Sequence, residues 1–225
     1  KARAELTEDQ FAQEYMADFR KQEGLVYKEF DRTRHLIDEL PIKAKDSPEQ
    51  HLAGIDFGFT NPTAVIQIKY SDGIFYVYSE WYKTQRTEEQ IAEYVKSCEF
   101  NAVYPDPEAP SAIEVMNKKG IPVMEVLKNK DSIKNGINAI RQLLKANRLK
   151  IHSSCINLIS EFESYAYPNP RPDRNENENP IKDHDHALDA LRYVISSFTD
   201  NSEARKKMQS IFRRNRQMAY LNSNK

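Results

Sequence analysis

The feature that most constrains the fold is a series of three apolar and β-branched runs within residues 51–78. The runs cover residues 51–57, 63–69 and 74–78, and a turn containing Ser71, Asp72 and Gly73 separates the last two. Such runs, joined by short turn-prone segments, are typical of neighbouring antiparallel strands. The sequence therefore predicts a three-stranded meander beginning near residue 51.

After the meander, the pattern changes to alternating helices and strands. Thr87 with Gln90 three residues later forms a capping box, which marks the start of a helix. Apolar spacing predicts helices near residues 87–98, 110–119, 132–147, 153–165 and 185–198, and short strands at 102–104, 122–127 and 149–152. We therefore expect an α/β fold with a mixed central sheet, in which helices flank a three-strand antiparallel meander plus parallel strands.

The chain divides into three predicted parts. Residues 1–50 are expected to hold a helix from Thr7 to about Gly24 and an extended connector over 24–40, with a boundary near Gln50. Residues 51–200 form the main domain. Residues 201–225 carry seven basic side chains and one acidic one, which suits either a phosphate- or partner-binding arm or a solvated terminal helix.

Composition excludes some classes of protein. The 225 residues are 39% hydrophobic, and no run is long and apolar enough to cross a bilayer, so no membrane role is expected. The polar first residues do not look like a signal peptide, which favours a soluble, cytoplasmic protein. Cys98 and Cys155 lack the spacing of a zinc site or a disulfide framework. The net charge of −1 neither supports nor excludes nucleic-acid binding.

Two acids stand where predicted strands end. Asp56 closes an apolar strand, and an acid there must be hydrogen-bonded, paired or bound to a cation. Asp106 lies just after the strand at 102–104, at the sheet edge where α/β folds place ligand-binding groups. Taken alone, Asp106 is more simply explained as a turn residue.

A third acidic group lies on the predicted last helix. Asp185, His186 and Asp189 have a spacing that puts them near one helix face. The helix dipole accounts for Asp183 and Asp185 in the first turn. It does not account for Asp189, which falls between the apolar residues Leu188 and Leu191.

Carboxylates from several elements at one sheet edge suit hard divalent cations. Two Mg²⁺ or Mn²⁺ ions bound there would clamp a phosphodiester for hydrolysis. Because clustered acids repel one another, replacing Asp56, Asp106 or Asp189 by Asn is expected to leave the chain folded and slightly more stable.

In the order of these motifs the chain resembles the RNase H-like nucleases, and more closely the nuclease domain of the large terminases of tailed phages. The matching segments are Gly54-Ile-Asp-Phe-Gly58, the loop from Asp106 to Ile113, and Asp185-His-Ala-Leu-Asp-Ala-Leu-Arg-Tyr193. The resemblance implies an endonuclease that cleaves double-stranded DNA during phage genome packaging. It implies a metal-binding triad of Asp56, Asp106 and Asp189, supported by Asp185 or His186. Glu108 could replace or support Asp106.

The resemblance also implies partners. Lys128 or Lys130 would lie near the substrate phosphate, although simple exposure explains both lysines slightly better. An ATPase domain of the same full-length chain is expected as a partner, because no GxxxxGK[ST] loop occurs here. The phage portal, the small terminase subunit and a place in the host cytoplasm are implied in the same way.

The segment 168–182 lacks apolar periodicity and is expected to be a mobile loop that controls access to DNA. Its basic side chains, Arg171, Arg174 and Lys182, are candidates for phosphate contacts.

Three alternatives stay open. The first is another RNase H-like nuclease or a junction resolvase. The second is an actin-like phosphotransferase, although the chain has only six glycines and no Gly-Gly pair for a nucleotide site. The third is a non-catalytic partner-binding module whose acids are structural.

Overall fold

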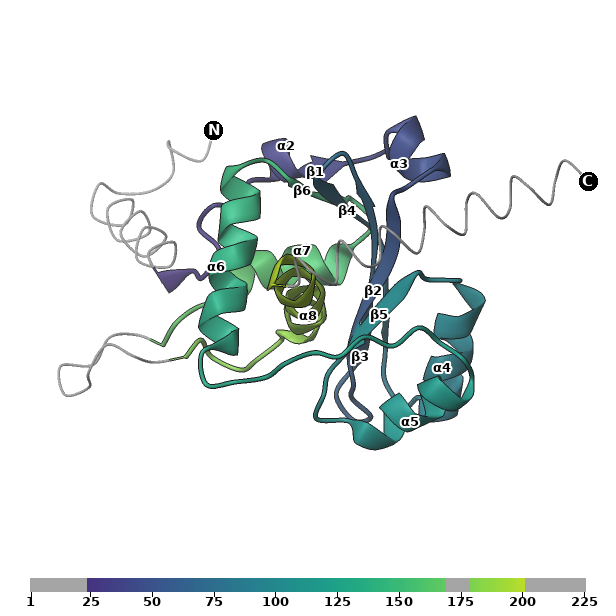
Figure 1. Cartoon of the computed structure of the whole chain (residues 1–225). Helices are drawn as coiled ribbons and strands as arrows, with labels where there is room; N and C mark the ends of the chain where they lie inside the picture. The colour runs from purple at the N-terminus through teal and green to yellow at the C-terminus, as the bar shows by residue number, and fades with distance from the viewer. Residues whose placement is uncertain (1–23, 169–178, 201–225) are drawn as a thin grey trace, which may run out of the picture.

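A computed structural model describes residues 24–168 and 179–200 and arranges them as a six-stranded sheet with helices on both faces (Figure 1). The strands are β1 (Leu36–Ile37), β2 (Gln50–Asp56), β3 (Thr63–Ser71), β4 (Ile74–Lys83), β5 (Ala102–Pro105) and β6 (Leu149–His152). The helices are α2 (Arg32–His35), α3 (Ile42–Asp46), α4 (Glu88–Ser97), α5 (Pro110–Lys118), α6 (Ser132–Lys145), α7 (Ile156–Ser164) and α8 (His186–Asp200).

The predicted meander is confirmed. Strands β2, β3 and β4 pair antiparallel, with Asp56 opposite Ala64 and Ser71 opposite Ile74. Asp72 and Gly73 form the two-residue turn between β3 and β4, and both adopt positive φ, as a tight hairpin turn requires. The predicted capping box is also present, with Thr87 and Gln90 bonding each other's backbone at the start of α4.

Parallel strands extend the meander on both sides. The sheet order is β1-β6-β4-β3-β2-β5, in which β5 is parallel to β2, β6 to β4, and β1 to β6. The predicted mixed sheet flanked by helices is therefore confirmed.

Alternating residues of β2 face two separate cores. Leu52 packs into the larger core with α6, α7 and α8, whereas Ala53 and Ile55 pack into the smaller one with α4 and α5 (Figure 1). Side chains two residues apart on a strand share a face. Asp56 therefore emerges on the side of the sheet that α8 covers.

Gly54 lets α8 lie directly on β2. A Cβ atom at this position would overlap the backbone carbonyl of Ala190 and come within 2.8 Å of Val194 Cγ2. The missing side chain allows the helix backbone to approach the strand closely. This contact brings the first turn of α8 alongside the end of β2, where Asp56 lies.

The segment expected as an extended connector is more ordered than predicted. It contains α2 and the edge strand β1, and Val26 and Tyr27 are buried in the larger core. Leu25 also forms a bridge to Ala166 after α7. The half-buried apolar residues Leu36 and Ile37 explain the difference, because they pair with the otherwise open edge of β6.

The predicted strand at 122–127 is wrong. Val103 and Val123 form a single isolated bridge, in which Val103 N donates to Pro122 O at 2.9 Å and Met124 N donates to Val103 O at 2.8 Å. Pro122 has no amide hydrogen to extend the ladder, and Val126 turns into the larger core instead.

Other predicted features lie outside the described residues: the helix from Thr7 to about Gly24, most of the 168–182 loop, and the basic tail at 201–225. Ile181, near the end of this loop, lies beside Ala166, which precedes the loop, because Ile181 N donates to Ala166 O at 3.0 Å. No helix in the described part of the chain is long and apolar enough to span a membrane.

Candidate metal centre

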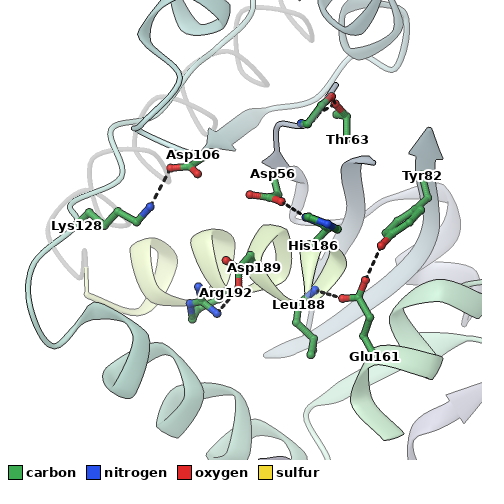
Figure 2. A network of polar contacts seen from close by, with 11 residues as sticks. Asp56, Thr63, Tyr82, Asp106, Lys128, Glu161, His186, Leu188, Asp189 and Arg192 are labelled. Carbon is green, nitrogen blue, oxygen red and sulfur yellow. Dashed lines mark hydrogen bonds and ion pairs between the residues drawn. The ribbon is translucent and has the colours of Figure 1, made fainter. Parts of the chain in front are cut away.

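Asp56 is a buried acid at the end of β2. Its Oδ2 atom lies 2.8 Å from Nδ1 of His186, the first residue of α8 (Figure 2). Burial raises the pKa of the Asp56 carboxyl; the His186 hydrogen bond opposes this shift, and the charges on Asp189 and Asp106 add to it. The hydrogen bond to Asp56 in turn raises the pKa of His186. A hydrogen-bonded pair of titratable side chains, Asp56 and His186, thus joins β2 to α8.

Asp106 follows β5, the neighbour of β2. Its amide donates to Ile55 O at 2.8 Å, which fixes it beside the end of β2. Its Oδ1 atom accepts from Glu108 N at 3.0 Å and lies 3.2 Å from Lys128 Nζ. Lys128 also lies 3.0 Å from Glu108 Oε1, so one lysine neutralises both acids that the sequence left as alternatives.

Asp189 lies in the first turn of α8 and contacts a buried cation. Its Oδ1 atom is 2.5 Å from Nη1 of Arg192, which is buried. Burial lowers the pKa of Arg192, but the charge of Asp189 and its hydrogen bond outweigh this effect and raise the pKa. Asp185, also buried, accepts from Asp189 N at 2.8 Å through its backbone carbonyl. Burial and the nearby Asp189 charge raise the pKa of Asp185.

The three acids come together from three elements. In Figure 2, Asp56 and Asp106 lie at the same end of the sheet, above α8, and Asp189 rises from α8 below them. Tyr193 is consistent with a concentration of negative charge there, because burial and then Asp189, Asp106 and Asp56 raise the pKa of its hydroxyl. The structure therefore brings together the predicted triad with His186.

The donor set fits a divalent metal, and each acid also has a basic side chain beside it. His186, Lys128 and Arg192 pair with Asp56, Asp106 and Asp189. Within residues 24–168 and 179–200, no three His, Cys, Asp or Glu side chains form a ready coordination shell. Carboxylate oxygens are the ligands that Mg²⁺ and Mn²⁺ prefer. An ion at this place would compete with His186 and Lys128 for the charge of these carboxylates.

Sequence reasoning missed Glu161 of α7. This side chain is 3% exposed and accepts from Leu188 N at 2.8 Å and from the Tyr82 hydroxyl at 3.0 Å (Figure 2). Burial raises its pKa to about 7, against the effect of the backbone donors Leu188 and Ala187 and of Tyr82. The signal was present, because Glu161 continues the buried spacing between Leu158 and Tyr165.

The predicted DNA contacts divide into three groups. Lys128 lies at the acidic cluster, as just described. Lys130 is exposed in the same segment, and Lys182 is exposed shortly before α8. Arg171 and Arg174 lie outside the described residues.

Comparison with known proteins finds relatives that are all described as terminases. The family model described as "Terminase RNAseH like domain" matches residues 56–197, which include all three acids. The large terminase subunit of Escherichia phage T5 is 27% identical over 212 residues, covering 88% of this chain and 47% of that protein. The chain thus spans about half the length of this curated relative.

Solved structures agree on the fold. The large terminase of a thermophilic bacteriophage, solved in complex with ATP-gamma-S, matches with a TM-score of 0.66 and 26% identity over 76% of this chain and 45% of that one. The large terminase nuclease domain of bacteriophage SPP1, with bound Mn, matches with a TM-score of 0.58 and 20% identity over 71% of this chain and 93% of that one. By sequence and by fold, this chain belongs to the terminase RNase H-like domain family.

Proposed function

We propose that this chain is a divalent-metal-dependent endonuclease that cleaves double-stranded DNA during phage genome packaging. The observation that carries the proposal is the convergence of Asp56, Asp106 and Asp189 from β2, the loop after β5 and α8 (Figure 2). These carboxylates are the proposed metal ligands, with His186 and Asp185 as further candidates. The manganese bound by the SPP1 nuclease domain supports Mn²⁺ or Mg²⁺ as the cofactor.

Two divalent ions, when bound, would activate a water molecule and stabilise the departing 3′-oxygen of a phosphodiester. The residues of this chain prepare for that chemistry. His186 Nδ1 lies 2.8 Å from Asp56 Oδ2, so the imidazole can hold a proton beside this carboxylate. Arg192 forms a buried ion pair with Asp189, and Lys128 holds positive charge beside Asp106, where a phosphate would approach.

Substrate contacts beyond the acids are assigned to basic side chains around this edge of the sheet. Lys128 lies nearest the acids, and Lys130 and Lys182 are exposed. We add Arg171 and Arg174 of the 168–182 loop and the basic tail at 201–225 on sequence grounds alone. Such contacts would position the duplex without reading its sequence.

The proposed partners follow from the relatives. The chain covers 47% of the T5 protein, and the similar terminase of the thermophilic bacteriophage was solved with ATP-gamma-S. We therefore assign residues 51–200 to the nuclease, with the segment that holds Val26, Tyr27 and β1 packed onto it, and propose that residues 1–50 also lead to an ATPase domain of the same full-length chain. The portal and the small terminase subunit would complete the assembly in the host cytoplasm.

A plasmid assay tests the proposed activity. With Mn²⁺ or Mg²⁺, supercoiled DNA should become nicked and linear with little sequence preference, and a chelator should abolish cleavage. Asp56→Asn should be inactive under the same conditions while remaining folded. Supercoiled DNA that stays intact at high protein and Mn²⁺ would refute the proposal, and cutting confined to branched DNA would indicate a resolvase.

A further inference from the structure

We infer that Glu161 is a positioning residue that holds the first turn of α8, and thereby His186 and Asp189, in place for metal binding. The inference rests on the proposed function for the metal, and on geometry for the placement. Glu161 belongs to α7 and has no place in the acidic cluster itself. It acts through the helix that carries the proposed ligands.

The contacts of Glu161 join three elements. Oε2 accepts from the backbone amide of Leu188 on α8, and Oε1 accepts from the hydroxyl of Tyr82 on β4. Leu188 lies between His186 and Asp189 in the same helical turn. Figure 2 shows Glu161 and Tyr82 on one side of this turn and Asp56 on the other.

Tyr82 ties Glu161 to the imidazole as well. The centroids of the Tyr82 and His186 rings are 6.3 Å apart in an edge-to-face arrangement, and the Tyr82 hydroxyl donates a hydrogen bond to Glu161. His186 is therefore held by Asp56 through Nδ1 and bordered by Tyr82 on another side. Displacing Glu161 would loosen both the helix terminus and one wall around the imidazole.

A buried carboxylate is an expensive way to cap a helix. Glu161 is 3% exposed, and an apolar residue would fill the same place without the desolvation penalty. The first amides of a helix need acceptors, and a carboxylate is a strong one. Removing a residue that holds a metal ligand in position, without binding the metal itself, typically lowers metal affinity by about 10–100-fold.

Glu80 provides a matched control. Its Oε1 accepts from Asn157 N at 2.8 Å, and its Oε2 accepts from Leu158 N at 2.9 Å, so it caps α7 as Glu161 caps α8. The two acids make the same type of contact one helix apart. Of the two, Glu161 is the one that contacts the helix bearing His186 and Asp189.

The experiment compares Glu161→Ala, Glu161→Gln and Glu80→Ala in the full chain. Mn²⁺ affinity is measured by calorimetry without DNA, and amide exchange over residues 186–190 is measured without metal. Glu161→Ala should weaken Mn²⁺ binding by about 10-fold or more and speed exchange in this turn. Glu161→Gln should keep most of the affinity, because its carbonyl oxygen can still accept from Leu188. Glu80→Ala should lower stability with affinity within about 2-fold of wild type.

The outcomes separate the two proposals. Wild-type affinity and exchange in Glu161→Ala would overturn the positioning role. Failure of the wild type to bind Mn²⁺ would defeat the proposed function, and exchange at Leu188 would then decide the positioning role alone. If Glu161→Ala does not fold, Tyr82→Phe removes one of the two contacts, and it should weaken Mn²⁺ binding by about 2–3-fold; unchanged affinity in that variant would count against the inference.

Discussion

The Oδ1 atom of Asp189 lies 2.5 Å from Nη1 of Arg192, one turn further along α8. The carboxylate proposed as a metal ligand is therefore also the counter-charge of a buried guanidinium. Removing a partner from a buried ion pair leaves an uncompensated charge. This pairing changes the expectation that neutralising any of the three acids would slightly stabilise the protein.

For Asp189→Ala we expect a loss of about 3–5 kcal/mol in the free energy of unfolding, because Arg192 stays buried and charged. Urea denaturation without metal measures this. Asp106→Ala is the matched comparison, since its partner Lys128 has a side chain 29% exposed and should adapt at a cost of about 1 kcal/mol or less. Equal losses in the two variants would contradict the assigned role of Arg192.

Lys128→Met should increase Mn²⁺ affinity by about 3–10-fold, because Lys128 now neutralises Asp106 and Glu108 and competes with the ion. The same change should weaken DNA binding at low salt, since it removes a charge beside the proposed phosphate position. Calorimetry and a binding titration test the two effects. Lys130→Met, exposed in the same segment, should leave Mn²⁺ affinity unchanged.

The pH dependence of the free energy of unfolding should reveal the raised pKa of Glu161. Burial raises its pKa from 4.5 in the unfolded chain to about 7 in the folded state. Its contribution is therefore fully present below pH 4.5 and is lost as the pH rises through about 7. Between about pH 5 and 8, Glu161→Gln should gain up to about 3 kcal/mol relative to the wild type.

Two other titratable side chains border Glu161 and affect that measurement. Tyr82 on β4 and His186 on α8 border Glu161, and the pKa of each is raised. Because the charge of Glu161 raises the pKa of His186, the difference between the two stability curves reports Glu161 together with its effect on His186. Parallel curves over the same pH range would show that Glu161 does not titrate there.

Gly54→Ala should destabilise the chain by about 3 kcal/mol or more, because the new Cβ would overlap a backbone carbonyl of α8 that cannot rotate away. The folded fraction should also bind Mn²⁺ more weakly, since α8 must move away from β2. Thermal melting and calorimetry measure these effects. Gly24→Ala, with no atom within 4 Å of the new Cβ, serves as the control and should be near neutral.

Features governed by near neighbours in sequence were predictable. The Thr87 capping box and the Asp72-Gly73 hairpin turn are local interactions, and their residues determine them directly. The position of Asp56 followed from the apolar run before it. The meeting of Asp56 and Asp106 at one edge followed from strand polarity once the mixed sheet was inferred. Asp189 lies on α8, and it was placed with them by the resemblance alone.

Features that depend on distant packing were not predictable. The pairing of β1 with β6 joins Leu36 to Ile151, and no local pattern indicates that these residues meet. The same limit applies to Glu161, whose burial could be inferred from helical spacing but whose partner on α8 could not. The prediction of a strand at 122–127 was wrong for a related reason, because Val126 is buried in the larger core and does not extend the sheet edge.

The first described residues are held to the rest of the domain by several backbone hydrogen bonds. Val26 N bonds Tyr165 O, Tyr167 N bonds Gly24 O, and β1 runs parallel along β6. A pull on this segment would load these bonds side by side rather than one after another. Tyr165 directly follows α7, so a pull on this segment would act on the end of the helix that carries Glu161. Tension from the N-terminal side would therefore load the helix whose Glu161 side chain bonds α8.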